Sequence, residues 1–135
     1  MASDIAPLVR QRVAERAGFR CEYCLIREED AGYPHQVDHI LSRKHGGDSS
    51  LDNLAYACVL CNRHKGSDIA TIDPDSGQAV ALFHPRRDLW KQHFRMRGIR
   101  RRLEGRSATG RATIRILRLN ALERLAERAE IAALR

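Results

Sequence analysis

Apolar positions in the first half of the chain fall into short runs separated by polar turns. Residues 7–18 predict a helix that ends at Gly18, because apolar side chains recur there near helical spacing. These side chains are Leu8, Val9, Val13 and Ala17. Residues 35–41 predict a short strand, and a second apolar run covers residues 54–60. Residues 61–65 follow that run as part of a second helix.

The second half of the chain gives weaker signals. Two short apolar runs, residues 69–72 and 79–83, are separated by turn-forming residues and predict a hairpin. Residues 88–94 predict a short helix that buries Trp90 and Phe94.

Residues 95–106 are rich in arginine, and from Thr109 onward the apolar spacing favours one long amphipathic helix. We expect that helix to pack on this domain or on a second copy of the chain, and we favour this packing role over a contact with DNA. Short strands, a β-hairpin and flanking helices together predict the α+β class.

Length and charge narrow the classes of function. The chain has 135 residues, which suits one domain, and a net charge of +7 with a pI of about 9.8. A basic chain favours a polyanion as partner, although an ordinary basic soluble protein would have the same balance. No apolar run resembles a signal peptide or approaches the ~20 residues of a membrane span. We expect a cytoplasmic protein without a membrane partner.

Four cysteines form two CxxC pairs, Cys21 with Cys24 and Cys58 with Cys61, separated by 33 residues (58 − 24 − 1). Four thiolates suit tetrahedral zinc, and a complete sulfur set leaves no open position, so the zinc would be structural. Disulfides are disfavoured by the reducing compartment, and a redox pair by the lack of a βαβ frame.

Asp38 and His39 stand side by side within the apolar strand. Side chains alternate along a strand, so both serve one site only if the strand ends nearby, and the turn residues 42–47 provide that end. A histidine has an ordinary pKa of about 6.5, which suits a general base. Aspartate is a hard oxygen ligand for magnesium or manganese.

Asn62, Arg63, His64 and Lys65 follow the second cysteine pair. If they lie near the start of a helix, its free amides and these side chains face phosphate. A solvated helix start is the alternative.

The order of CEYC, HQVDHILSRKHGG and LDNLAYACVLCNRHKGSD resembles the HNH endonuclease family over roughly residues 15–70. The later segment LFHPRRDLWKQHF resembles a tail of some bacterial members. The resemblance implies the ββα-metal (His-Me finger) fold, a β-hairpin and a helix around one divalent cation.

The resemblance also implies roles for individual residues. His39 matches the general base, Asp38 and Asn62 match ligands of magnesium or manganese, and Asn53 matches the residue that bonds across the hairpin loop and orients the base. The four cysteines match zinc knuckles of a subset of members. Position 62 is often histidine in the family, so His64 is a rival ligand, but residues 62 and 64 point to opposite sides of a helix.

These correspondences predict a divalent-metal-dependent DNA endonuclease that nicks or cuts both strands. Residues 1–94 would form the nuclease domain, and residues 95–135 a basic helical extension that packs on it or mediates a homodimer. The DNA contacts expected are Arg63, His64, Lys65, Arg86 and Arg87. A non-catalytic zinc-finger DNA-binding module and a homo-oligomeric scaffold are the alternatives.

Overall fold

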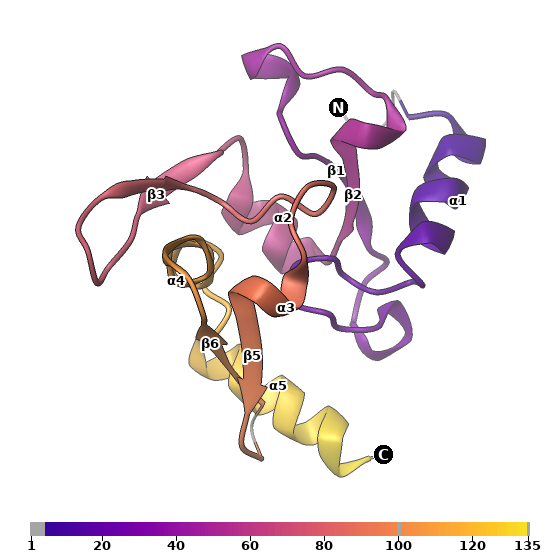
Figure 1. Cartoon of the computed structure of the whole chain (residues 1–135). Coiled ribbons are helices and arrows are strands. Elements are labelled where there is room, and N and C mark those ends of the chain that lie inside the picture. The colour runs from indigo at the N-terminus through magenta and orange to yellow at the C-terminus, as the bar shows by residue number, and fades with distance from the viewer. Residues whose placement is uncertain (1–4, 100, 135) are drawn as a thin grey trace. The chain divides into compact units, whose positions relative to one another are not determined.

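The computed structural model describes residues 5–99 and 101–134. The chain divides into two compact units: unit 1 is Met1–Ile69 with His84–Arg87, and unit 2 is Ala70–Phe83 with Asp88–Arg135. Short strand pairs and helices confirm the α+β class (Figure 1). The functional division at residue 94 stays a prediction.

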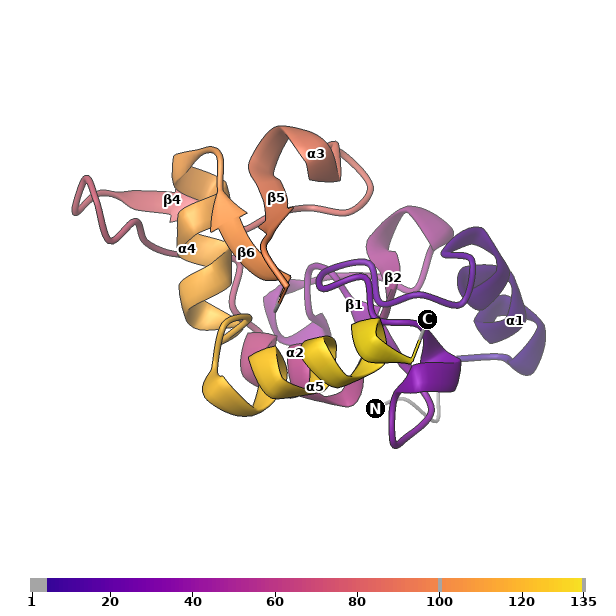
Figure 2. The ribbon, with the colours of Figure 1, turned by 90° about the horizontal axis from the view of Figure 1, so that it is seen from below.

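Unit 1 is built on an antiparallel hairpin of β1 (Gln36–His39) and β2 (Leu54–Ala57). Its helices are α1 (Pro7–Arg16) and α2 (Val59–Lys65), which lie on opposite sides of the hairpin (Figures 1 and 2). Single 3₁₀ turns cover Glu28–Asp30, Arg43–His45 and Leu51–Asn53. The first helix and the strand expected at residues 35–41 are confirmed, with the strand three residues shorter. The apolar run at residues 54–60 forms β2 and the start of α2, so the second helix begins two residues before Cys61.

The two faces of this hairpin have different chemistry. Register pairs Val37 with Tyr56 and His39 with Leu54, and opposite residues share a face. Val37, Leu54 and Tyr56 are buried in one apolar core with Val13 and Ala14 of α1. The α2 side of the hairpin therefore receives the alternate β1 residues, which are polar.

The described residues of unit 2 form two hairpins and three helices. Strands β3 (Ala70–Ile72) and β4 (Ala79–Ala81) form the expected first hairpin. Helix α3 (Trp90–His93) leads into β5 (Phe94–Arg97), which pairs with β6 (Arg102–Gly105). Phe94 is buried as expected, whereas Trp90 is only half-buried and packs on it with a ring separation of 5.1 Å.

The single long helix expected from Thr109 onward is wrong. The structure has α4 (Ala108–Ile116) and α5 (Leu122–Ala133), because Arg118 adopts a left-handed φ of 52° and ends the first helix. The Asn120 side chain then bonds the backbone of Leu103, at 2.9 Å to its nitrogen and 2.7 Å to its oxygen. These bonds hold the break in place.

Two close contacts hold α4 in unit 2. A Cβ at Gly110 would lie 2.0 Å from the carbonyl oxygen of His93, so only glycine fits there. Arg111 donates to both carboxylate oxygens of Asp73, at 2.9 and 3.0 Å, and so attaches α4 to the β3–β4 turn. In the described part of the chain, no helix has the length and apolar character needed to cross a membrane.

Candidate functional site

The four cysteines converge in unit 1. Cys21 and Cys24 follow α1, whereas Cys58 caps the start of α2 and Cys61 lies in its first turn. All four are buried, and their sulfur atoms lie within 4.8 Å of one another. The Cys24 and Cys58 sulfur atoms are 3.7 Å apart, and tetrahedral zinc with 2.3 Å bonds needs about 3.8 Å. The four cysteines are thus positioned to bind a metal, in a geometry compatible with zinc.

Each cysteine pair forms the same local turn. The Cys24 amide lies 3.4 Å from the Cys21 sulfur, and the Cys61 amide lies 3.4 Å from the Cys58 sulfur. Hydrogen bonding from Cys21 lowers the pKa of Cys58 and of Cys24, whereas burial raises the pKa of Cys21 and of Cys61. Two thiols of the cluster therefore favour the thiolate form, which is the form that binds a cation.

Asp38 lies on the α2 side of β1 and is buried. Its Oδ2 accepts a 2.7 Å hydrogen bond from the Tyr23 hydroxyl and lies 3.3 Å from the Lys65 ammonium. Burial raises the pKa of Asp38, and the positive charge of Lys65 acts against that shift. Tyr23 lies between Cys21 and Cys24, so the first knuckle directly contacts the expected metal ligand.

The sequence did not predict a role for Tyr23. A tyrosine between two cysteines can be an ordinary core residue or a hydrogen-bond partner of Asp38, and the sequence does not distinguish the two. Lys65 was expected to contact DNA. In the structure it is 2% exposed and donates to the carbonyl oxygen of Ile40 at 3.0 Å as well as to Asp38. It joins α2 to the end of β1, and its contact with phosphate stays a prediction.

His39 is the last residue of β1, so the strand ends where the sequence required it. Its side chain starts on the face opposite Asp38 and is half-buried. The ring nitrogen Nε2 lies 3.0 Å from the Ser49 hydroxyl oxygen. The loop after β1 therefore supplies a contact that orients the imidazole.

Asn53 closes that loop. Its Oδ1 accepts from the Leu41 amide at 2.9 Å, and its Nδ2 donates to the carbonyl oxygens of Leu41 and Asp48 at 2.9 and 2.7 Å. The backbone passes so closely that a Cβ at Gly47 would lie 1.7 Å from the Leu41 oxygen. The bonds across the loop are those the resemblance implied, while the effect of Asn53 on catalysis stays a prediction.

Asn62 and Lys65 lie on the same side of α2, facing β1. The Asn62 amide nitrogen donates to Gln36 at 2.5 Å, and Gln36 shares the strand face of Asp38. The next residues on α2 differ: Arg63 is exposed, and His64 is turned by about 200° from Asn62. The structure thus brings Asp38 and Asn62 to one face of the hairpin.

Two further residues were expected to hold DNA. Arg86 forms an ion pair with Glu22, whose other oxygen accepts from the Tyr56 amide at 2.8 Å. Burial lowers the pKa of Arg86 to about 10. This pair attaches residues 84–87 to the first knuckle, whereas Arg87 is exposed. Contact of either arginine with DNA stays a prediction.

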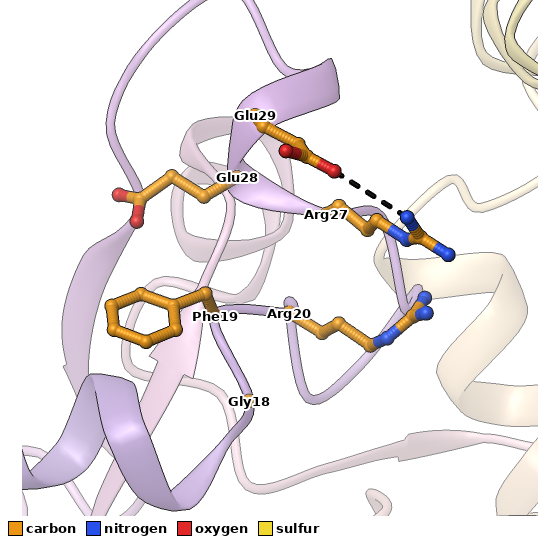
Figure 3. Close-up of a pocket in the computed structure, with 6 residues that line it drawn as sticks. All are labelled: Gly18, Phe19, Arg20, Arg27, Glu28 and Glu29. Atoms are coloured by element: carbon orange, nitrogen blue, oxygen red, sulfur yellow. Dashed lines mark hydrogen bonds and ion pairs between the residues drawn. The ribbon is translucent and has the colours of Figure 1, made fainter.

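A pocket of about 570 Å³ lies beside the first knuckle (Figure 3). Two arginines and two glutamates balance its charge, and Arg27 lies 3.4 Å from Glu29. The lining residues are Gly18, Phe19, Arg20, Arg27, Glu28 and Glu29. None of the expected site residues lines it, and its balanced charge does not favour a polyanion.

The comparisons with known proteins agree with this geometry. Residues 21–68 match the family model described as HNH endonuclease, and this segment holds both cysteine pairs, Asp38, His39, Asn53 and Asn62. The chain is 26% identical over 121 residues to the Septu protein PtuB of Bacillus thuringiensis. That alignment covers 88% of this chain and 44% of the relative, so the chain spans less than half of the relative's length.

No solved structure matches the chain. The family match extends from the first knuckle to just beyond α2, which is the β-hairpin and helix that carry the geometry described above. The chain therefore contains an HNH endonuclease domain at residues 21–68.

Proposed function

We propose that the chain is a divalent-metal-dependent endonuclease that hydrolyses DNA phosphodiester bonds. The observation that carries the proposal is the placement of Asp38 and Asn62 on facing sides of β1 and α2, next to the strand end at His39. A binding module would need neither a buried carboxylate at this point nor an imidazole beside it.

His39 is the general base. Its imidazole removes a proton from the attacking water, and the contact with the Ser49 hydroxyl fixes the ring. Asn53 acts on the same loop through its bonds to Leu41 and Asp48, so it positions the imidazole without touching the phosphate. The reaction leaves a 5′ phosphate and a 3′ hydroxyl.

Asp38 and Asn62 would hold magnesium or manganese. Both side chains offer hard oxygen atoms, and a carboxylate that already bonds Tyr23 and Lys65 retains acceptor positions for a cation. Such a cation stabilises the negative charge that develops on the phosphate and on the leaving oxygen. Two protein ligands leave the remaining positions to water and to phosphate, as is usual for magnesium.

The cysteine cluster would hold zinc in a structural role. Four sulfur ligands complete a tetrahedron and leave no position for water or substrate. A metal site made of four cysteines requires thiols that stay reduced, and we propose a cytoplasmic location on that ground.

In unit 1, we propose that the exposed side chains of Arg63 and Arg87 contact the DNA backbone. One such site cuts one strand, so double-strand cleavage would need a second copy or two successive nicks. We propose a homodimer as one route to it, with α5 as the candidate interface.

A plasmid-nicking assay tests the proposal. Zinc-loaded protein should convert supercoiled DNA to the nicked or linear form with magnesium or manganese, and His39→Ala should lose this activity by at least a hundredfold. His45→Ala is the matched control, because His45 lies exposed in the same loop. Full activity of His39→Ala, or no cleavage by the wild type with either metal, would contradict the proposal.

A further inference from the structure

The positive charge of the chain is concentrated in one stretch. Residues 88–120 contain ten Lys or Arg and two Asp or Glu, a net charge of +8. The rest of the chain has 14 basic and 15 acidic residues, a net charge of −1. This stretch belongs to unit 2, whereas the candidate nuclease residues belong to unit 1.

The β5–β6 hairpin separates basic from apolar side chains by register. Arg95 lies opposite Glu104, and Arg97 lies opposite Arg102, so these four share one face. The other face carries Phe94, Met96, Leu103 and Gly105. This second face packs on α4 so closely that a Cβ at Gly105 would lie 2.5 Å from the Arg111 nitrogen. The arginine face is therefore directed away from α4.

The arginines on this face are exposed and only partly balanced. The side chains of Arg95 and Arg97 are 47% and 57% exposed, and both contact Glu104, at 2.9 and 3.3 Å. This face thus carries three guanidinium groups and one carboxylate, which contacts two of them. Arg97 and Arg102 stand directly opposite each other, and like charges in that position destabilise a hairpin. An external anion would remove that repulsion.

Further exposed basic residues lie at both ends of the hairpin. Arg106 donates to the carbonyl oxygen of Lys91 at 3.0 Å, which brings the two residues together after β6. Arg101 lies just before β6 and is also exposed. The basic hairpin surface comprises Lys91, Arg95, Arg97, Arg101, Arg102 and Arg106, all exposed.

We propose that the basic hairpin surface binds the phosphate backbone of duplex DNA without regard to base sequence. The proposal rests on the proposed nuclease function, which makes DNA the ligand. Guanidinium groups match phosphate oxygens in geometry, and a two-stranded ribbon has the width of a major groove. Contacts of this kind supply affinity through counterion release and carry little sequence information.

This surface supplies what unit 1 lacks. Unit 1 contains eleven basic and ten acidic residues, so it has almost no net attraction for a polyanion. A nuclease must hold a long polymer while it acts on one phosphate. Unit 2 provides that affinity, and unit 1 provides the chemistry.

The test is the salt dependence of DNA binding by the full chain. Binding of a fluorescent 20-base-pair duplex is measured by anisotropy without added divalent cation, from 50 to 200 mM salt, in the His39→Ala background. The test variant adds Arg97→Gln and Arg102→Gln. The matched control instead adds Arg12→Gln and Arg20→Gln, which remove the same charge from exposed positions of unit 1.

The test variant should bind at least fivefold more weakly at 50 mM salt, with a slope of log affinity against log salt reduced by about 2, because two phosphate contacts are lost. The control should change the slope by less than half as much. The melting temperature of the test variant should not fall below that of the parent, since the opposed charges of Arg97 and Arg102 are gone. Equal slopes for the two variants would overturn the proposal.

Polyglutamate of matched charge is the competitor that distinguishes an acidic protein from DNA. Displacement of DNA by polyglutamate at equal charge concentration would overturn the assignment to DNA and favour an acidic protein partner. The cleavage assay is scored separately. Hairpin-dependent DNA binding without cleavage by the wild type would reject the nuclease function and leave this binding surface intact.

Discussion

At the scale of single residues, Asp38 contacts one side chain from each of the two cysteine-containing segments. Burial makes its negative charge costly, and two partners compensate for that cost: the hydroxyl of Tyr23 and the ammonium of Lys65. The first partner lies between Cys21 and Cys24, and the second lies four residues after Cys61. The cysteine cluster and the candidate active site are therefore connected through one carboxylate.

Removing Lys65 should have a large effect on stability. Lys65→Met leaves a buried carboxylate without its positive partner, and breaking such a pair costs about 3–5 kcal/mol. Urea unfolding of the zinc-loaded variant measures this loss. Lys44→Met, at an exposed position, should change the free energy of unfolding by less than about 0.5 kcal/mol. Equal stability of the two variants would show that the pair contributes nothing to the fold.

At the scale of elements, each unit contains a short hairpin that polar contacts attach to a helix. In unit 2 the β3–β4 turn is attached to α4 through Asp73 and Arg111. The Asp73 side chain is fully buried, and its hydrogen bonds with Arg111 lower its pKa. Folding therefore stabilises the ionised form of this carboxyl.

This pair predicts a pH dependence of stability. A carboxyl with a lowered pKa in the folded state stabilises the fold above its ordinary pKa of about 3.9 and loses that effect as pH falls through the lowered value. Arg111→Gln should lower the melting temperature at pH 7, and the difference from wild type should shrink as the pH falls below about 4. Thermal unfolding at pH 7 and at pH 3 measures both. A constant difference would exclude this linkage.

The elements also show how far the sequence could predict the fold. The strands and helix around the cysteines followed from local patterns, and the bonds of Asn53 followed from the resemblance. The break at Arg118 did not, because the apolar periodicity continues through it and a left-handed arginine has no sequence signal. The β5–β6 hairpin was not predicted, because its strands contain few apolar residues and many arginines, so the alternation is weak.

The sequence predicted which residues form the candidate site better than it predicted the contacts between them. The cysteine spacing fixed the cluster, since four thiols in two close pairs have few other uses. The buried position of Lys65 could not be foreseen, because a lysine beside Arg63 and His64 looks like surface charge. The contact of Tyr23 with Asp38 could not be foreseen either, because the two residues are 15 positions apart in sequence.

At the scale of the whole molecule, two units divide the properties of the chain. Unit 1 contains the cysteine cluster and the candidate nuclease residues, and unit 2 contains most of the net charge. Each has its own buried residues: Val13 and Leu54 are examples in unit 1, and Leu103 and Leu117 in unit 2. The metal cluster is therefore expected to stabilise one unit more than the other.

Zinc removal tests this division. Chelation should unfold unit 1, since zinc binding free energy is folding free energy in a small domain, while α4 and β6 of unit 2 keep most of their protection. Hydrogen exchange measured by mass spectrometry, with and without chelator, reports both units in one experiment. Equal loss of protection in β1 and in α4 would mean that the units unfold together.

The proposed nuclease requires that Asp38 and Asn62 hold a divalent cation between β1 and α2. Its most direct test is the titration of zinc-loaded protein with manganese, followed by electron paramagnetic resonance. We predict one manganese site per chain, an affinity at least tenfold weaker in Asn62→Ala and Asp38→Asn, and no change in His64→Ala. A site that survives both substitutions, or that depends on His64 instead, would contradict the claim.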